Sequence, residues 1–376
     1  MTDSMDLPLA KGASLEEILD EFTIESASGD LWAGISGDRI KCYACGHRCN
    51  IPPGGRGICK VRFNRDGKLR VPWGYVGGFQ CDPTEKKPFF HVHPGSNTLT
   101  FGMLGCDLHC SYCQNWLTSQ SLRDSAAVSD PREISAEALI SKGIRLDPVM
   151  VASSYNEPLI TSEWAVEVFR HARTAGLKTA FVSNGNATPD VLNYLRPWTD
   201  CYKIDLKTMS DRNYRKLGGV LQNVLDTIKM VYERGFWMEI VTLLVPDWNS
   251  SEAELRDAAQ FLGSISPEIP WHVTAFHKDY KMTVPDNASA KLLVRAAEIG
   301  KEVGLSYVYA GNLPGQVGEF ENTWCPSCDG LLVQRTGFLV GQVRIGEDGC
   351  CPDCGRITPG FWGRVERKGD GSVRAL

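Results

Sequence analysis

The sequence predicts an α/β fold in which a partial or full (β/α) barrel is flanked by two smaller cysteine-rich segments. Two observations lead to this prediction. Between residues 98 and 316, short apolar runs alternate with amphipathic helical patterns, and repeated β-then-α units form parallel sheets with right-handed crossovers. Twelve of the fourteen cysteines gather in groups before this region, near its start and after it, and only Cys81 and Cys201 stand alone.

The chain is predicted to divide into four parts. Residues 1–35 form a tail with one short helix at 14–22, where Ser14 and Glu17 have the spacing of a capping box. Residues 36–97 form a cysteine-rich domain of loops and short strands, as their Gly and Pro content favours. Residues 98–316 form the barrel. Residues 317–376 form a zinc-ribbon-like domain, because two Cys-Pro-x-Cys turns flank an alternating stretch. The expected barrel strands are 98–103, 149–153, 179–183, 201–206, 238–245, 272–276 and 307–310, and the expected helices are 160–176, 221–234, 251–262 and 288–303.

Composition and charge exclude several classes of protein. The hydrophobic content of 43% and the charged content of 23% are those of a globular chain. A net charge of −5 gives no electrostatic reason to expect nucleic acid or anionic lipid as a partner. No apolar run approaches the roughly 18 residues that span a membrane, and the acidic N-terminus lacks the apolar stretch of a signal peptide. We therefore expect a cytoplasmic protein with no membrane partner.

Three cysteines directly after the first barrel strand are the candidate catalytic group. Cys106, Cys110 and Cys113 are separated by three and two residues, so one tight loop can direct three thiolates at a common centre. A 4Fe–4S cluster held in this way keeps one iron without a protein ligand. The alternative is a zinc site completed by His109. Tyr112 and Trp116 are expected to pack around and shield the loop.

The Cys-x3-Cys-x2-Cys loop after the first strand of a (β/α) barrel resembles the radical S-adenosylmethionine (SAM) superfamily. The strings 105–116 and 82–91 more narrowly resemble the radical SAM enzyme of the AmmeMemoRadiSam system, which is related to pyruvate formate-lyase activating enzymes. The resemblance implies that SAM binds the open iron and that one electron splits it into methionine and a 5′-deoxyadenosyl radical, which abstracts hydrogen from an unidentified substrate. It also implies an electron donor of flavodoxin or ferredoxin type, and Memo-like and AMMECR-type partner proteins.

The same resemblance places SAM contacts at the ends of later strands. Each position also has a structural interpretation: a charge at a helix N-terminus for Glu157, a buried ion-pair network for Asp205 and Lys207, and core packing for His277. The chain departs from the superfamily's Gly-Gly-Glu pattern by having Tyr-Asn-Glu-Pro at 155–158. We expect Asn312 to lie beside these SAM contacts at the ends of the barrel strands, and His272 to be structural. The candidate SAM contacts are Asn156, Glu157, Ser183, Asn184, Asp205, Lys207 and His277.

The two flanking cysteine groups are predicted to bind metal outside the catalytic centre. The paired turns of Cys325, Cys328, Cys351 and Cys354 indicate zinc, and Cys350 is a spare. For Cys42, Cys45, Cys49 and Cys59 zinc is favoured, a closed second cluster is the alternative, and His47 could replace one ligand. The run 82–94, which contains Glu85, Lys86, Lys87, His91 and His93, either lines the substrate mouth or is a solvated loop.

Three functions are compatible with these features. The first is a radical SAM enzyme with an unidentified substrate. The second is an activase that places a glycyl radical on a partner protein; many activases carry a cysteine insertion after the SAM loop, and residues 114–148 contain no cysteine. The third is a zinc-binding scaffold or nucleic-acid-binding module, which the acidic balance and the unpaired three-cysteine loop disfavour.

Overall fold

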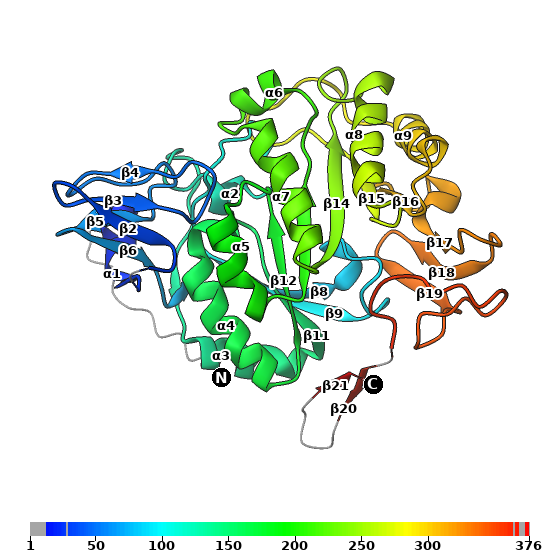
Figure 1. The fold of residues 1–376 in the computed structure, drawn as a ribbon, viewed down its shortest axis with the longest axis horizontal. Helices are drawn as coiled ribbons and strands as arrows, with labels where there is room; N and C mark the ends of the chain where they lie inside the picture. Colours follow the sequence, from blue (N-terminus) through cyan, green and yellow to red (C-terminus); the bar gives the residue numbers. More distant parts are fainter. Residues whose placement is uncertain (1–12, 28, 364, 368–372, 376) are drawn as a thin grey trace.

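An eight-stranded sheet forms the centre of the molecule in the computed structural model (Figure 1), with the strand order β16-β15-β14-β13-β12-β11-β9-β8. Neighbouring strands from β9 to β16 are parallel, and β8 pairs antiparallel with β9. Within the described residues β8 and β16 are not paired with each other, so the barrel is partial. The strands are β8 (Gly78–Pro83), β9 (Asn97–Gly102), β11 (Pro148–Ser153), β12 (Lys178–Ser183), β13 (Cys201–Asp205), β14 (Trp237–Leu244), β15 (Trp271–Ala275) and β16 (Val308–Gly311).

The structure describes residues 13–27, 29–363, 365–367 and 373–375. The first twelve residues of the expected N-terminal tail lie outside this range, as do residues 28, 364, 368–372 and 376 of the two end segments. The expected short helix is present as α1 (Leu15–Glu21), and its capping box forms between Ser14 and Glu17.

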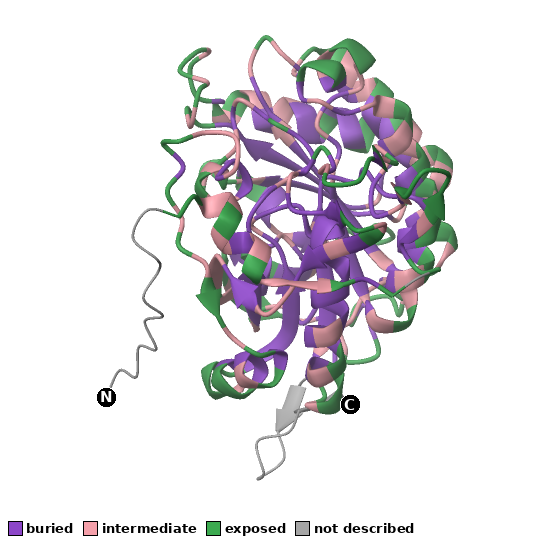
Figure 2. Ribbon diagram, turned by 90° about the vertical axis from the view of Figure 1, so that its left-hand side faces the viewer, coloured by how far each residue is buried: buried purple, intermediate pink, exposed green. Residues whose placement is uncertain are grey.

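Helices cover the outer face of the sheet (Figures 1 and 2), and most residues of its parallel strands are buried. In α4, which was expected within 160–176, the apolar side chains of one face are buried, including Trp164, Val168 and Phe169. Serine or threonine side chains cap several of the N-termini, as Ser251 does for α8 and Ser289 for α9, and such caps contribute about 1 kcal/mol each. The helices are α2 (Trp116–Ser119), α3 (Ala136–Gly143), α4 (Ser162–Thr174), α5 (Pro189–Leu195), α6 (Asp211–Lys216), α7 (Leu221–Glu233), α8 (Glu252–Ile265) and α9 (Ala290–Val303), with 3-10 turns η1 (Thr84–Lys86), η2 (Ile144–Leu146), η3 (Pro158–Thr161), η4 (Arg196–Trp198) and η5 (Gly318–Glu321).

Small antiparallel sheets lie on two opposite sides of the barrel (Figure 1). One side carries the sheets β1-β6-β5 and β2-β3-β4, and the other carries β17-β18-β19. We call residues 23–72 the N-terminal sheets and residues 323–362 the C-terminal ribbon. Their strands are β1 (Thr23–Glu25), β2 (Trp32–Ile35), β3 (Arg39–Cys42), β4 (Asn50–Ile51), β5 (Phe63–Arg65), β6 (Lys68–Pro72), β17 (Thr323–Trp324), β18 (Leu331–Thr336) and β19 (Leu339–Val343); β7 (Tyr75–Val76) pairs with β10 (Arg132–Glu133), and β20 (Val365–Arg367) with β21 (Val373–Ala375).

None of the described helices is both long and apolar enough to cross a lipid bilayer.

Candidate active site

The three-cysteine loop leaves the C-terminal end of β9, the position at which barrel folds carry their chemistry. Its backbone is fixed from the far side, because Arg123 Nη1 donates to the Cys106 carbonyl at 2.7 Å and Gln120 Nε2 donates to the Leu108 carbonyl at 3.2 Å. Gly105 has φ +95°, and a Cβ there would lie 3.0 Å from Val61 Cγ1. A glycine is therefore required where the loop passes the N-terminal sheets.

The loop opens onto a cavity of about 370 Å³. Cys110 and Cys113 line the cavity, and Cys106 lies half-buried behind them with its sulfur accepting a hydrogen bond from the Leu108 amide at 3.4 Å. Burial raises the pKa of all three thiols, to about 12 for Cys110. A bound metal centre, being cationic, would favour the thiolate form of such buried thiols. No other cysteine among the described residues lines this cavity, so the donor set fits a cluster with three protein ligands and one open iron.

One wall of the cavity is formed by charged side chains at the end of β13. Lys203 and Lys207 both donate to the Asp205 carboxylate, Lys207 over 3.2 Å. Burial alone would raise the pKa of Asp205, but the two ammonium groups lower it to about 2. Two cations against one carboxylate leave a net positive wall, which suits a ligand carboxylate. Asp205 and Lys207 were predicted here, whereas Lys203 was not.

Glu157, Ser183 and Asn184 are brought together beneath the loop. The Glu157 carboxylate accepts hydrogen bonds from the Ser183 hydroxyl at 2.7 Å, the Asn184 amide at 2.7 Å and the Leu159 amide at 3.1 Å. Burial, and then the charge of Asp107, raises its pKa to about 8. These three predicted residues do not line the cavity. In this arrangement the Glu157 side chain joins the loop after β11 to the loop after β12.

Asn156 and His277 also lie outside the cavity lining. Asn156 accepts a hydrogen bond from the Met103 amide at 3.0 Å and so supports the start of the cysteine loop. The His277 side chain is 53% exposed. His272, which was expected to be structural, lines the cavity and bonds Glu239 at 2.7 Å. Asn312 lines the cavity as expected.

Asp107 is a central residue of the site that sequence reasoning missed. This carboxylate is 1% exposed and accepts hydrogen bonds from Asn184 Nδ2 at 2.7 Å and Asn186 Nδ2 at 2.8 Å. His47 Nε2 lies 3.1 Å from the Asp107 carbonyl oxygen. Asp107 therefore connects the cysteine loop to the loop after β12 and to the N-terminal sheets. No sequence pattern marks it, because its partners are far away along the chain.

His109 does not turn toward the cavity lining. Its imidazole packs on Gly218, which has φ +85° and would place a Cβ 2.5 Å from the ring. Its backbone amide donates to the Leu217 carbonyl at 2.9 Å. The contacts of His109 are thus those of a packing residue.

The opposite wall of the cavity comes from the run after β8 and from the C-terminal ribbon. Glu85 is fully buried there; its Oε1 accepts from the Gly95 amide at 3.1 Å and faces Arg335 Nε at 3.5 Å. Its Oε2 has no hydrogen-bond partner among the described residues. Lys87 pairs with Asp82 at 2.9 Å. The residues of this wall are Glu85, Lys86, Lys87, Pro88, Phe90, Glu321, Gly337 and Phe338.

His91 and His93, from the same run, join the barrel to the C-terminal ribbon. His91 Nδ1 contacts the Pro359 carbonyl at 2.8 Å, and His93 Nδ1 contacts the Gly363 carbonyl at 2.8 Å. Burial lowers the pKa of His91 to about 4. The run 82–94 thus contributes Glu85, Lys86 and Lys87 to the cavity, and its histidines to the interface.

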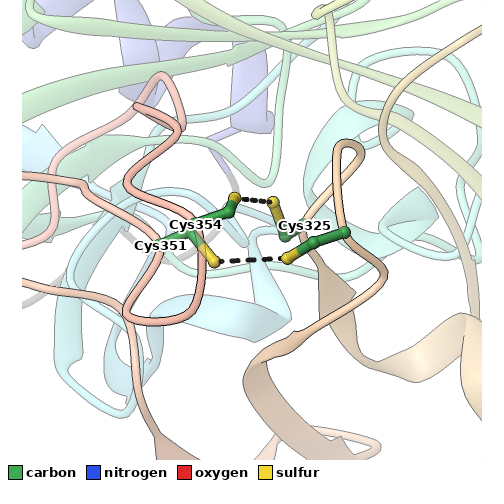
Figure 3. A group of neighbouring side chains, drawn as sticks. Cys325, Cys351 and Cys354 are labelled. Atoms are coloured by element: carbon green, nitrogen blue, oxygen red, sulfur yellow. Dashed lines mark hydrogen bonds between the residues drawn. The ribbon is translucent and has the colours of Figure 1, made fainter.

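The four cysteines of the C-terminal ribbon form a preassembled metal site (Figure 3). Their sulfur atoms all lie within 4.8 Å of one another, with 3.6 Å between Cys325 and Cys354 and 3.7 Å between Cys328 and Cys351. Tetrahedral zinc with bonds of about 2.3 Å requires sulfurs about 3.8 Å apart, so the donor set fits zinc. Cys350 is not part of this group.

Comparisons with known proteins found a family model and several relatives. The family model described as "Radical SAM superfamily" matches residues 101–262. An uncharacterized protein of Methanocaldococcus jannaschii is 32% identical over 324 residues, which cover 85% of this chain and 95% of that one. The pyruvate formate-lyase-activating enzyme of Clostridium pasteurianum is 26% identical over 203 residues, 51% of this chain and 82% of that one. A crystallised domain of a pyruvate-formate lyase-activating enzyme from Bacteroides vulgatus has a TM-score of 0.39 at 22% identity, and covers 43% of this chain and 98% of that one.

Proposed function

Because the chain belongs to the radical SAM superfamily and resembles the pyruvate formate-lyase activating enzymes, we propose that it cleaves SAM to generate a radical for hydrogen abstraction. Cys106, Cys110 and Cys113 would hold a 4Fe–4S cluster. When bound and reduced, such a cluster would supply the electron that splits the sulfonium of SAM into methionine and a 5′-deoxyadenosyl radical. The observation that carries this proposal is the three-cysteine loop opening onto a lined cavity.

The other residues of the site would bind and orient SAM. Lys207 and Lys203 present cations to the methionine carboxylate, and Asp205 holds both ammonium groups in place over the cavity. Glu157 fixes Ser183 and Asn184 without entering the cavity, so its role is to position the loops rather than to contact SAM. His272 and Asn312 line the side on which the substrate would lie.

The finer features follow the resemblance and the donor sets. We assign zinc to Cys325, Cys328, Cys351 and Cys354, because their sulfur spacing matches that ion. We place the enzyme in the cytoplasm, since none of the fourteen cysteines is in a disulfide bond and cysteine-rich chains of this kind belong to reducing compartments. The AmmeMemoRadiSam assignment, an electron donor of flavodoxin or ferredoxin type, and Memo-like and AMMECR-type partners remain proposals that rest on the strings 82–91 and 105–116.

The test is anaerobic reconstitution with iron and sulfide, followed by reduction in the presence of SAM. We expect 5′-deoxyadenosine and methionine to form in equal amounts, and Cys110→Ala to reduce both to background. Cys81→Ala is the matched control, because this half-buried thiol lies outside the cavity lining and should leave the rate unchanged. Undiminished cleavage by Cys110→Ala would contradict the assignment of the loop, and a preparation that binds zinc but no iron would indicate a scaffold.

A further inference from the structure

The N-terminal cysteine group forms a second cluster of thiols close to the active-site loop. Cys42, Cys45 and Cys59 are buried, and Cys49 is half-buried. The Cys42 amide donates to the Cys49 carbonyl at 2.9 Å, and the Ile58 amide, one residue before Cys59, donates to the Cys49 sulfur at 3.5 Å. Cys45 lies in the turn between Cys42 and Cys49, where its carbonyl accepts from the Arg48 amide at 3.0 Å. The turns of the N-terminal sheets thus gather the four cysteines between β3 and β5.

The spacing of these sulfurs differs from that in the C-terminal ribbon. Across the residues that the structure describes, Cys325, Cys328, Cys351 and Cys354 form the one group of three or more ligating atoms within 4.8 Å of one another. No three sulfurs of the N-terminal group, all of them described, meet that spacing. A single zinc ion gathers its four sulfurs to about 3.8 Å from each other. In a cubane cluster each thiolate binds a different iron, so its cysteines stand farther apart.

The N-terminal group is also packed directly against the active-site loop. The Cys59 carbonyl lies 3.3 Å from the position that a Cβ on Gly105 would occupy, next to Cys106. On the other side of the group, His47 contacts the Asp107 carbonyl at 3.1 Å, and the Gly46 amide donates to the Asn186 carbonyl at 2.7 Å. The segment that holds Cys59 thus contacts Gly105, which precedes Cys106, and the segment that holds Cys45 contacts Asp107, which follows it.

One thiol of the group, that of Cys49, is less buried than the other three. Cys49 accepts a hydrogen bond from the Ile58 amide at 3.5 Å, and the Ile58 side chain is 48% exposed. At the other end of the same loop, the Cys59 backbone carbonyl lies next to Gly105. The group therefore bridges the protein surface and the cysteine loop of the active site.

We propose that Cys42, Cys45, Cys49 and Cys59 hold a closed 4Fe–4S cluster through which the reducing electron reaches the active site. This inference rests on the proposed radical SAM function. One electron leaves a low-potential donor of the flavodoxin or ferredoxin class, enters at Cys49, and leaves past Cys59 to reduce the cluster held by Cys106, Cys110 and Cys113. The donor is oxidised by one electron and the active-site cluster is reduced by one; no covalent bond forms or breaks and no proton moves.

The first experiment removes the active-site cluster and asks whether iron remains. The variant Cys106→Ala/Cys110→Ala/Cys113→Ala is reconstituted anaerobically and analysed for iron, sulfide and zinc. We expect about four irons and four sulfides per chain, about one zinc, and an electron paramagnetic resonance signal after reduction. A folded triple variant with no iron and about two zinc ions overturns the inference. Chemical iron and sulfide analysis of the reconstituted wild-type protein gives the same answer without mutation, as about eight irons per chain against about four.

The second experiment tests the electron path. Cys49→Ser should slow SAM cleavage driven by reduced flavodoxin at least tenfold, while SAM binding, measured by equilibrium dialysis, and cleavage driven by dithionite stay within twofold of wild type. Equal slowing with both reductants, or with neither, contradicts the path. Failure of the two proposals is distinguishable: iron in the triple variant with no SAM cleavage by the wild type refutes the proposed function, and cleavage by a wild type that holds about four irons refutes only the second cluster.

Discussion

Two buried arginine–glutamate pairs connect the flanking segments to the barrel, and they differ in the number and length of their hydrogen bonds. On the N-terminal side, Arg62 donates two hydrogen bonds of 2.6 and 2.7 Å to the Glu163 carboxylate of α4, and the Ser26 hydroxyl donates a third of 2.8 Å. On the C-terminal side Arg335 approaches Glu85 at 3.5 Å, and Glu85 Oε2 has no described partner. Both pairs are almost fully excluded from solvent.

The pKa directions of the two carboxyl groups follow from this geometry. Burial would raise the pKa of Glu163, but Arg62 lowers it below its usual value. Burial also raises the pKa of Glu85, and Arg335 offsets this only in part. The two short hydrogen bonds from Arg62 compensate the Glu163 carboxylate for its lost hydration, whereas the single long contact from Arg335 does not do so for Glu85. The N-terminal sheets are therefore fixed to the barrel, whereas the C-terminal contact keeps a free acceptor at the cavity wall.

The largest effect on stability is expected for Arg62→Met. It leaves the Glu163 carboxylate unpaired in the core, so the free energy of unfolding should fall by about 3–5 kcal/mol. Urea denaturation under anaerobic conditions measures this change. Adding Glu163→Gln to the same chain should recover part of the loss; a double variant no more stable than Arg62→Met would show that packing of the Arg62 stem, rather than charge, carries the interaction.

A smaller loss is expected for Arg335→Met. Because the pKa of Glu85 is already raised, this carboxyl group can take up a proton when its partner is removed, and the cost is limited to lost hydrogen bonds, about 1–3 kcal/mol. Arg335 also donates to the Phe90 carbonyl at 2.7 Å and to Thr323 Oγ1 at 2.8 Å. Urea denaturation of both variants under the same conditions shows which one loses more free energy of unfolding. A greater loss for Arg335→Met than for Arg62→Met would contradict the difference that we infer between the two pairs.

The smallest effects are expected in the pH dependence, and they have opposite signs. Glu163 stabilises the fold above its unfolded pKa of 4.5, and this contribution is lost as the pH falls through its lower folded pKa. The stabilising contribution of Glu85 is present below pH 4.5, its unfolded pKa, and is lost as the pH rises through its higher folded pKa. A folded pKa that differs by one from the unfolded pKa changes the free energy of unfolding by about 1.4 kcal/mol.

Single glutamine variants separate these two contributions. Relative to wild type, Glu163→Gln should become more destabilising as the pH rises from about 3 to 5, and Glu85→Gln should become less destabilising as it rises from about 5 to 8. Urea denaturation over this range measures both. Parallel profiles for the two variants would contradict the difference between the pairs.

Much of the barrel could be predicted from sequence because its signals are local. Buried parallel strands read as short apolar runs between amphipathic helices, so the seven parallel strands of the central sheet were found within one residue or so of their ends. The cysteine loop is equally local. The antiparallel strand β8 was missed, because Gly78–Pro83 contains Gly, Asp and Pro, which disfavour strands on propensity grounds.

The polar connections of the site could not be predicted in the same way. Arg335 and Glu85 are 250 residues apart, and Asp107 is 77 and 79 residues from its two asparagine partners. A pairing over such separations leaves no periodic pattern in the sequence. His272 and His277 illustrate a related limit. His272 lies in β15 and His277 lies just after it, and the sequence does not tell which of the two imidazoles lines the cavity. The structure shows that it is His272.

The ribbon turn at Gly337 and Phe338 has a consequence for how such enzymes diversify. These residues, with Glu321, complete the cavity from outside the barrel strands, while the cysteines that we propose as cluster ligands lie on the loop after the first parallel strand. Replacement of the ribbon would therefore change which molecule fits the chamber and leave the initiating machinery intact, so selectivity and reactivity can be inherited as separate modules.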